Sequence, residues 1–335
     1  MGFIILDGYL INYECEVNMN NIYVRMSGRL GNQLFRYATA RYIQETQGGR
    51  LIFDFSPVYK EGKVKPGEIG FENSLKYFKI KEYDEKSATV LDTDKGNIKQ
   101  KIYFIISMCI LRCGGVHSKI FEWLNNHNSR NGLYITLYGP RYCEIRDSLT
   151  KDKFVYGRFE DIKYFDKIRD KLLHELQPVE DELVENKDLY DILKSDKQTV
   201  CISIRRGDYV SNIEFEKKLN ICTKEYFERA VNCIKQKIDN PIFIVFSDDI
   251  EWCKANIDFI KKENCYFESG NDPIWEKLRL MYMCKHFIIS NSTFSWWSQY
   301  LSRNEEKIVI APSSWFKNDN NGSKYPLLLD SFIKI

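Results

Sequence analysis

The residues best suited to chemistry form the run Ser290-Asn291-Ser292-Thr293, which is followed by Phe294-Ser295-Trp296-Trp297. An apolar strand is expected over residues 286–290, and a helix is expected to begin within the run. The first amides of a helix have no internal partners, and the helix dipole places its positive end there. The pattern therefore predicts a phosphate site at Asn291, Ser292 and Thr293, with the two tryptophans as an apolar wall. Helix capping is a second role for Ser292 and Thr293.

Two adjacent arginines, Arg205 and Arg206, follow an alternating strand expected over residues 200–204. Arginine carries a planar, permanently charged fork that suits a pyrophosphate, and ligands of open α/β sheets bind at the carboxyl ends of strands. Neighbouring strand residues point to opposite sides, so one arginine would enter the crevice while the other serves the structure. The alternative is a salt bridge to Asp208. We count Arg206 and Asp208 among the candidate catalytic residues.

A glycine-rich loop, Gly28-Arg29-Leu30-Gly31-Asn32-Gln33, follows the strand expected near residues 22–26. It lacks the G-x-G and the third glycine of a dinucleotide fingerprint. The glycines still favour close approach of the backbone to a ligand, lined by Gly28, Arg29 and Gly31. Asn32 and Gln33 would supply amide donors. A turn without a ligand is the alternative.

Acidic residues follow two further apolar runs. Ser247-Asp248-Asp249 comes after residues 241–246, a continuous run typical of a buried parallel strand, and would cap a helix over residues 250–256. Ser247 and Asp248 are therefore further candidates for ligand contact. Asp92 and Asp94 follow a strand-like run at residues 88–91 and could hold a divalent metal. We favour a solvated turn there and predict no metal site.

Alternating strands and helices must position these residues, which is the pattern of an α/β protein. Pro178 follows a helix expected over residues 164–176, and we place a domain junction there. The Lys-, Gly- and Pro-rich residues 58–70 are expected to form a loop. The regular alternation after residue 178 predicts a doubly wound Rossmann-like domain, and residues 22–54 predict a β-loop-α-β unit with its second strand at residues 50–54. The divisions are 1–20 for an N-terminal extension, 21–178 for the first domain and 179–335 for the second.

The composition excludes several classes of protein. A net charge of +2 gives no electrostatic reason to expect a nucleic-acid partner. The ten cysteines include no C-x-x-C pair, which favours buried reduced thiols over disulfides. No apolar run reaches the roughly 20 residues of a membrane span. The longest, Ile102–Leu111, suits a buried helix or strand, with a membrane-facing helix as the alternative. We expect no signal peptide and a cytoplasmic protein.

Three motifs in fixed order resemble glycosyltransferase family 11, the α-1,2-fucosyltransferases of bacteria and animals. A further segment, Gly157–Phe165, is also similar to the family, and the resemblance spans about residues 24–315. The three motifs begin at Gly28, Ile204 and Cys284, and read GRLGNQLFRYA, IRRGDY and CKHFIISNSTFSWW.

The resemblance implies a GT-B-like fold of two Rossmann-like domains facing a cleft, with an acceptor-side domain at residues 21–178 and a donor-side domain at residues 179–335. It implies metal-independent, inverting transfer from GDP-fucose to the 2-hydroxyl of a galactoside, without a cofactor. It also implies that Arg205 and Arg206 hold the donor pyrophosphate, that Ser292 and Thr293 lie at its other side, and that Asn32 lies near the reacting sugar. This agrees with the chemistry, because fixed arginine and amide donors stabilise the charge that develops on a leaving phosphate.

Two positions depart from the family pattern. Ser203 stands where many members have His, and Lys277, beside Glu276, stands where many have Asp. In related fucosyltransferases these positions face guanine. The Ser203 hydroxyl, together with either the Glu276 carboxylate or a main-chain group, would read the base here.

The sequence thus predicts an enzyme that takes a nucleotide-sugar donor and an oligosaccharide or lipid-linked glycan acceptor for a surface polysaccharide. It would act in the cytoplasm, either free or held peripherally at the inner face of the membrane. The alternatives are a transferase with another nucleotide-sugar donor, a metal-dependent hexosyltransferase that uses Asp92 and Asp94, and a non-catalytic protein that binds carbohydrate on its aromatic side chains.

Overall fold

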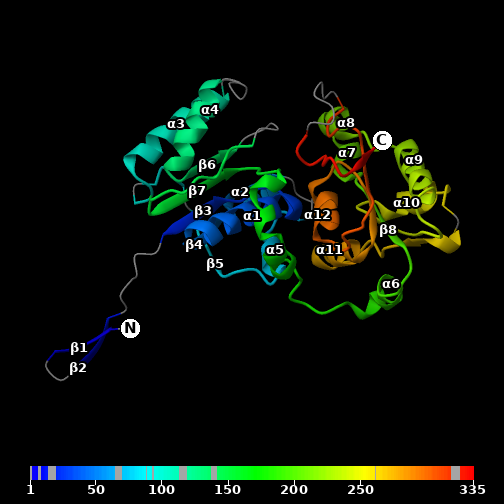
Figure 1. The fold of residues 1–335 in the computed structure, drawn as a ribbon, viewed down its shortest axis with the longest axis horizontal. Helices are drawn as coiled ribbons and strands as arrows, with labels where there is room; N and C mark the ends of the chain where they lie inside the picture. The colour runs from blue at the N-terminus through cyan, green and yellow to red at the C-terminus, as the bar shows by residue number, and fades with distance from the viewer. Residues whose placement is uncertain are drawn as a thin grey trace.

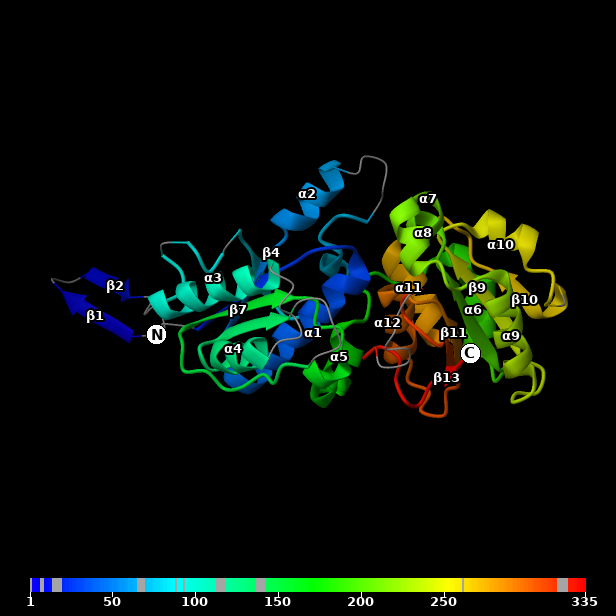
Figure 2. The same cartoon turned by 90° about the horizontal axis from the view of Figure 1, so that it is seen from above.

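The computed structural model of the chain contains two α/β bodies that lie side by side (Figures 1 and 2). It describes residues 2–6, 9–13, 20–64, 70–87, 89–92, 94–112, 119–136, 142–260, 262–317 and 325–335. Within these ranges the backbone alone is described for residues 2–13, 64, 119–121, 208, 211, 215 and 263.

A short hairpin precedes the first body. β1 (Gly2–Leu6) pairs with β2 (Tyr9–Tyr13) in antiparallel register. This hairpin belongs to neither of the two larger sheets and stands away from both bodies (Figure 1). It lies within the stretch that the sequence sets apart as an extension.

The N-terminal body is built on a sheet of parallel strands in the order β5-β4-β3-β7-β6. The order reverses between β3 and β7, which makes that edge the topological switch point. The strands are β3 (Asn21–Arg25), β4 (Arg50–Asp54), β5 (Tyr83–Glu85), β6 (Leu133–Thr136) and β7 (Asp152–Gly157). The helices are α1 (Leu30–Gln47), α2 (Ser56–Val64), α3 (Ile98–Arg112), α4 (Lys119–Arg130) and α5 (Arg169–Glu175), with short 3-10 helices at Ser74–Tyr77, Ile162–Tyr164 and Asp166–Ile168.

The C-terminal body has a second sheet of parallel strands, in the order β10-β9-β8-β11-β12-β13, whose switch point lies between β8 and β11. The strands are β8 (Thr199–Ile204), β9 (Ile242–Ser247), β10 (Cys265–Phe267), β11 (His286–Ile289), β12 (Val309–Ala311) and β13 (Ile333–Lys334). The helices are α6 (Lys187–Leu193), α7 (Gly207–Ser211), α8 (Ile213–Leu219), α9 (Lys224–Lys235), α10 (Ile250–Asn256), α11 (Ile274–Met283) and α12 (Thr293–Leu301), with 3-10 helices at Val184–Asn186 and Lys262–Asn264.

Aromatic side chains join the two bodies where α1 meets α12. The Phe35 ring centroid lies 5.1 Å from that of Trp296 and 5.0 Å from that of Trp297. Phe165 stacks on Trp297 at 5.4 Å. Both tryptophans are fully buried. The expectation that they wall a ligand pocket is therefore wrong: their rings form the core between the two bodies.

The predicted α/β class with two Rossmann-like sheets is confirmed. The apolar runs at residues 50–54 and 308–310 also predict strands. β4 has the predicted bounds, and β8, β9, β11 and β12 lie within one residue of theirs. Asp249 caps α10 as expected, since its carboxylate accepts a hydrogen bond from the Trp252 amide. The division of the chain at residue 178 stays a prediction.

Four local predictions are wrong. Part of the expected loop at residues 58–70 is the helix α2, while residues 65–69 lie outside the described chain. Residues 89–92 form a turn instead of a strand, closed by Asp92, whose carboxylate accepts from the Thr89 amide at 2.8 Å. The sequence predicts Asp272 as a helix cap and Pro273 at the first helical position, but Pro273 is itself the N-cap of α11. The run at Ile102–Leu111 forms most of α3, a surface helix whose outer face is apolar.

Candidate active site

The glycine-rich loop leaves β3 at the N-terminal switch point and enters α1. Gly28 has a φ of 71°, which favours glycine, and a Cβ there would lie 2.4 Å from Nδ2 of Asn32. Gln33 is fully buried: its amide nitrogen donates to the carbonyls of Gly28 and Glu72, and its amide oxygen accepts from the Ser74 amide. Gln33 therefore holds the loop in shape, and its contact with a ligand stays a prediction.

Asn32 lies at the start of α1 and is half-buried. Its carbonyl accepts a hydrogen bond from Nη1 of Arg36. Nη2 of Arg36 donates to the Ser27 hydroxyl at 2.7 Å. The Arg29 guanidinium lies 5.0 Å from the centre of the Phe71 ring. The arginine at position 36 thus fixes the loop that presents Asn32, a role that the spacing of the motif does not reveal.

Gly31 makes the contact between the two bodies possible. A Cβ at this position would lie 2.6 Å from Oγ1 of Thr293 and 2.7 Å from the amide nitrogen of Phe294. The indole nitrogen of Trp297 donates to the Gly31 carbonyl at 3.1 Å. The first turn of α1 therefore covers the first turn of α12, so the absence of a side chain at Gly31 serves helix packing.

The Ser/Thr loop after β11 connects the strand with α12. Asn291 is buried, and its amide nitrogen donates to the carbonyls of Leu219 and Trp315. Ser292 is the N-cap of α12 but makes no side-chain capping bond. Thr293 is half-buried beside Gly31. Asn291 thus anchors the loop to the C-terminal body. Ser292 and Thr293 lie at the start of α12.

Arg205 lies on the side of the C-terminal sheet that faces this loop. Its Nη1 is 2.7 Å from Oδ2 of Asp248, and its guanidinium lies 5.7 Å from the Tyr209 ring. The Tyr209 hydroxyl donates to the Asn291 carbonyl at 3.0 Å. Asp248 also accepts from the Arg206 amide at 2.8 Å. Arg205 is therefore held between the end of β9 and the loop that precedes α12.

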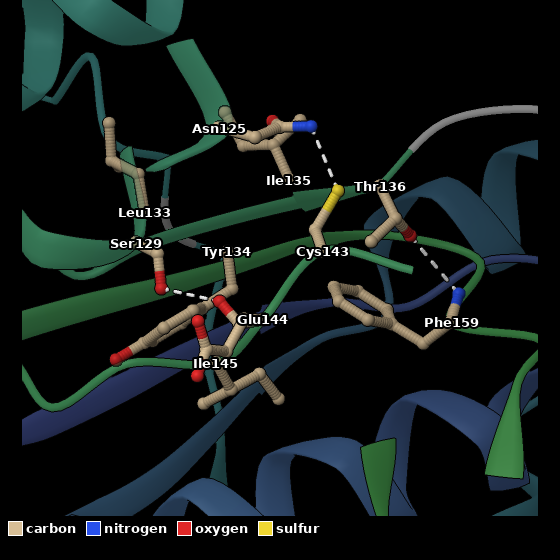
Figure 3. Close-up of a pocket in the computed structure, with 10 residues that line it drawn as sticks. All are labelled: Asn125, Ser129, Leu133, Tyr134, Ile135, Thr136, Cys143, Glu144, Ile145 and Phe159. Carbon is tan, nitrogen blue, oxygen red and sulfur yellow. Dashed lines mark hydrogen bonds between the residues drawn. The ribbon is translucent and has the colours of Figure 1, made fainter. Parts of the chain in front are cut away.

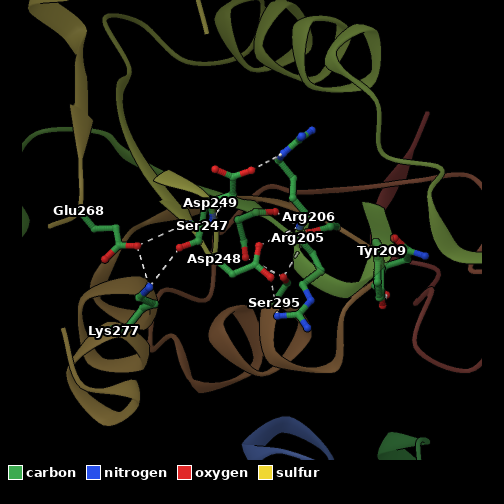
Figure 4. Close-up of polar contacts among 12 residues, drawn as sticks. Arg205, Arg206, Tyr209, Ser247, Asp248, Asp249, Glu268, Lys277 and Ser295 are labelled. Carbon is green, nitrogen blue, oxygen red and sulfur yellow. Dashed lines mark hydrogen bonds and ion pairs between the residues drawn. The ribbon is translucent and has the colours of Figure 1, made fainter. Parts of the chain in front are cut away.

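Arg206 points the other way (Figure 4). Its guanidinium lies 3.7 Å from the centre of the Trp252 ring, and its Nε is 3.1 Å from Oδ2 of Asp249. Both partners lie at the start of α10, away from the Ser/Thr loop. The predicted opposition of the two arginines is present, but Arg205 is the one beside the loop. The carboxylates beside them are Asp248 and Asp249. The Asp208 side chain lies outside the described part of the structure, so a salt bridge to Asp208 stays a prediction.

Buried hydroxyl groups tie the ends of β8 and β11 together. The hydroxyl oxygens of Ser203 and Ser295 lie 2.6 Å apart, and the Ser290 hydroxyl donates to the Ser203 carbonyl. All three residues are buried. Ser203 is thus bonded to α12, which gives its hydroxyl a structural partner in place of the expected base.

Lys277 reaches the carboxyl end of β9. Its ammonium is 2.7 Å from Oε1 of Glu268 and donates to the Ser247 carbonyl at 3.1 Å (Figure 4). Glu268 is buried and also accepts from the amides of Ser247 and Gly270. Glu268 is not among the candidates from the sequence. Its position directly after β10, at the carboxyl end of a strand, is the feature that could have identified it as a candidate site residue.

Glu276 does not belong to this cluster. It is fully buried, and its carboxylate accepts hydrogen bonds from the Tyr190 hydroxyl and the Asn186 amide near α6, with Arg279 3.3 Å away. The expectation that Glu276 reads the base is therefore wrong, because these contacts hold α11 against α6.

Asp92 and Asp94, the two residues of the alternative metal site, make other contacts in the structure. Asp92 closes its own turn, and Asp94 pairs with Lys95 at 2.6 Å. Over the residues that the structure describes, no group of three or more His, Cys, Asp or Glu side chains is placed to hold a metal ion. The metal-independent mechanism stays a prediction, since it concerns activity.

A small pocket lies elsewhere, in the N-terminal body between α4, β6 and residues 143–145 (Figure 3). Its polar groups bond to each other: the Asn125 amide donates to Cys143 Sγ at 2.8 Å, and the Ser129 hydroxyl donates to the Glu144 carbonyl. At its end the Phe159 amide donates to Thr136 Oγ1, and Phe159 has a φ of 57°. We assign this pocket no part in the chemistry.

Two Rossmann-like sheets whose switch-point loops meet form a GT-B-like fold, and an arginine–aspartate pair lies at one of these loops. Residues 21–325 match the sequence model of the family described as Glycosyl transferase family 11, and the chain belongs to that family. It is a glycosyltransferase, so the prediction of an enzyme is confirmed and the non-catalytic alternative is excluded.

Similar proteins include two from Escherichia coli. The chain is 30% identical to an alpha-1,2-colitosyltransferase, over 92% of this chain and 97% of that protein. It is 27% identical to the O-antigen biosynthesis glycosyltransferase WbnK, over 94% and 100%. Among solved structures it is similar to the NodZ alpha-1,6-fucosyltransferase co-crystallized with GDP, with a TM-score of 0.47 and 12% identity, over 84% of this chain and 92% of that chain.

Proposed function

We propose that this glycosyltransferase transfers fucose from GDP-fucose to the 2-hydroxyl of a galactoside, with inversion at the anomeric carbon. The family membership and the α-1,2 linkage in the name of the colitosyltransferase support this assignment. The observation that carries it is the position of Arg205, which lies at the carboxyl end of β8 between Asp248 and the loop before α12. A diphosphate bound there would meet a fixed guanidinium.

The reaction is a single displacement. The acceptor oxygen forms a bond to the anomeric carbon as the bond from that carbon to the phosphate oxygen breaks, and the departing GDP keeps the electron pair. Arg205 and the first amides of α12 would stabilise the negative charge on the leaving diphosphate. The acceptor hydroxyl gives its proton to a general base, and Asp208 stays a candidate catalytic residue from the sequence. Asn32 would contact the reacting sugar.

Guanine recognition would involve the cluster of Lys277, Glu268 and Ser247. An ammonium group has three hydrogens to donate, and two of them are directed at Glu268 and the Ser247 carbonyl. The third would serve a carbonyl oxygen of the base. Ser247 would thus act next to the donor through its main-chain carbonyl, which accepts from Lys277. Asp248 would act through its ion pair with Arg205.

The donor base can be tested by inhibition with free nucleotides. A site built to pair with the polar edge of guanine rejects a base that lacks this edge, because its own buried groups would be left unpaired. We expect GDP to inhibit transfer far better than UDP. Equal inhibition by the two nucleotides would exclude GDP-fucose as the proposed donor and favour another nucleotide sugar.

A colitosyl donor is the second candidate, and the similarity to the alpha-1,2-colitosyltransferase favours it. Colitose is fucose without its 3-hydroxyl, so both sugars would use the same base and diphosphate contacts. GDP-fucose and GDP-colitose should be compared at equal concentration with one galactoside acceptor. A site that hydrogen-bonds the 3-hydroxyl prefers GDP-fucose by a large factor, and preference for GDP-colitose would contradict the fucosyl assignment.

We further propose that the acceptor is a lipid-linked oligosaccharide of a surface polysaccharide, met in the cytoplasm at the inner face of the membrane. The name of WbnK, an O-antigen biosynthesis glycosyltransferase, supports this role. Of the helices in the described ranges, none has the length and hydropathy needed to cross a bilayer. Transfer to a lipid-linked galactoside, compared with the free oligosaccharide, tests the proposal.

A further inference from the structure

The outer face of α3 carries exposed isoleucines where a surface helix normally carries polar residues. Their exposed fractions range from 41% for Ile106 to 74% for Ile98, with Ile102 and Ile105 near one half. Cys109 is also exposed on this helix. The spacing of these five residues follows the 3.6-residue period, so they line one side of the helix. We call this surface the α3 face.

Polar contacts fix which side of α3 faces inward. Gln100 is buried, and its amide donates to the carbonyls of Asn131 and Asp152 at 2.8 Å each. Ser107, two turns further on, is buried too and accepts from the Asn128 amide at 2.8 Å. Since these two residues anchor the inner side, the helix cannot turn its isoleucines toward the sheet without leaving buried groups unpaired.

The chain segment that contains α3 is basic, with acidic residues only at its borders, Asp94 and Glu122. Between residues 95 and 121 the chain carries Lys95, Lys99, Lys101, Arg112 and Lys119 and no aspartate or glutamate. Lys99 and Arg112 are exposed at the two ends of α3. On the neighbouring helix α4, Trp123 is 56% exposed, and its ring centroid lies 4.1 Å from that of His127. Apolar side chains, an exposed tryptophan and flanking basic residues together are typical of helices that lie in a membrane interface.

We propose that the α3 face docks this enzyme on an anionic membrane surface. A 15-residue helix is about 22 Å long, shorter than the roughly 30 Å hydrocarbon core, so α3 would lie in the plane of the interface. Its isoleucines would enter the acyl boundary while Lys99 and Arg112 meet lipid phosphates. This inference extends the proposed action on a lipid-linked acceptor.

Vesicle sedimentation tests this inference with the full chain. The probes are vesicles of phosphatidylcholine alone and vesicles that contain about 30% phosphatidylglycerol, an anionic lipid. We expect binding to the anionic vesicles that weakens as salt is raised. The double variant Ile102→Gln, Ile105→Gln should bind about tenfold or more weakly, because it removes apolar area from the contact. Val184→Gln, at an exposed position in the C-terminal body, is the matched control and should bind as the parent does.

Transfer to a water-soluble galactoside separates this inference from the proposed function. α3 lies on the side of the N-terminal body that is away from the C-terminal body (Figure 2), and its isoleucines are exposed. The double variant should therefore keep its melting temperature and its soluble-acceptor activity. Undiminished vesicle binding by the double variant would overturn the inference. The inference would also be overturned if the parent chain did not bind vesicles but formed a concentration-dependent dimer that the double variant loses. The α3 face would then pair with a second copy of the chain.

Discussion

At the scale of single residues, the two arginines differ in what surrounds them. Arg205 lies between Asp248 and Tyr209, beside the loop before α12, whereas Arg206 stacks on Trp252 and pairs with Asp249. The sequence favours Arg206 as the catalytic arginine. The geometry favours Arg205 for the diphosphate and gives Arg206 the task of holding α10 and the end of β8 together.

This difference predicts unequal effects of the same substitution. Arg205→Lys keeps the charge but loses the bidentate fork, and we expect it to cost about 2–4 kcal/mol of transition-state stabilisation, the scale of one preorganised donor. Arg206→Lys is the matched control and should cost less in kcat/KM, with its effect mainly on melting temperature. Steady-state kinetics of both variants decide the matter. A larger kinetic loss for Arg206→Lys would restore the original assignment.

Residue roles that depend on distant partners could not be predicted from the sequence. Gln33 is an amide in a glycine-rich loop, which suggests a ligand donor, but its partners Glu72 and Ser74 lie about forty positions away along the chain. Glu276 stands beside Lys277, but the contacts with Asn186 and Tyr190 draw it to α6. Local spacing identifies the motif in each case, and only the tertiary contacts show which member faces inward.

At the scale of secondary-structure elements, the meeting of α1 and α12 controls how the two bodies sit together. Gly31→Ala places a methyl group against the main-chain nitrogen of Phe294, which cannot move without shifting the helix. We expect a loss of about 1–3 kcal/mol in unfolding free energy, typical of overpacking, and a fall in kcat/KM. Gly48→Ala, just after α1, has no atom within 4 Å of the added carbon and serves as control for backbone strain. Equal stability of Gly31→Ala and the parent would contradict this packing.

The junction of β11 and β12 predicts a pH dependence of stability. The Nδ1 atom of His286 accepts from the Ile308 amide, and burial lowers the pKa of His286 below its ordinary value of 6.5. The unfolded chain therefore binds this proton at a higher pH than the folded chain does. Above about pH 6.5 the histidine does not lower the free energy of unfolding. As the pH falls through that value toward the folded pKa, the free energy of unfolding decreases.

Thermal melting of the parent and His286→Gln between neutral and mildly acidic pH measures this contribution. The variant should lose less of its melting temperature on acidification than the parent, whatever its stability at neutral pH. Identical pH slopes would show that His286 does not carry the effect.

The elements that the sequence predicts well share one property. β4 and β9 are apolar runs bounded by turn or capping residues, so both their type and their ends are visible. α3 has apolar residues on nearly every side, so its pattern indicates burial and hides the exposed face. Only the inward contacts of Gln100 and Ser107 reveal which side is left outside.

At the scale of the whole molecule, the charge of the donor is expected to be met by protein groups alone. Arg205 and the first turn of α12 supply positive charge at the switch point of the C-terminal sheet. We therefore expect transfer to continue in excess EDTA. A loss of activity on chelation that manganese restores would contradict this mechanism and return Asp92 and Asp94 to consideration.

The account as a whole is tested most directly by one reaction. The purified chain is incubated with GDP-fucose and a β-galactoside in EDTA, and the product linkage is assigned by NMR while GDP release is measured. The account predicts stoichiometric GDP release and an α-linked fucosyl group on the 2-hydroxyl. Transfer from a uridine-diphosphate sugar but not from GDP-fucose, or a linkage at another hydroxyl, would contradict it.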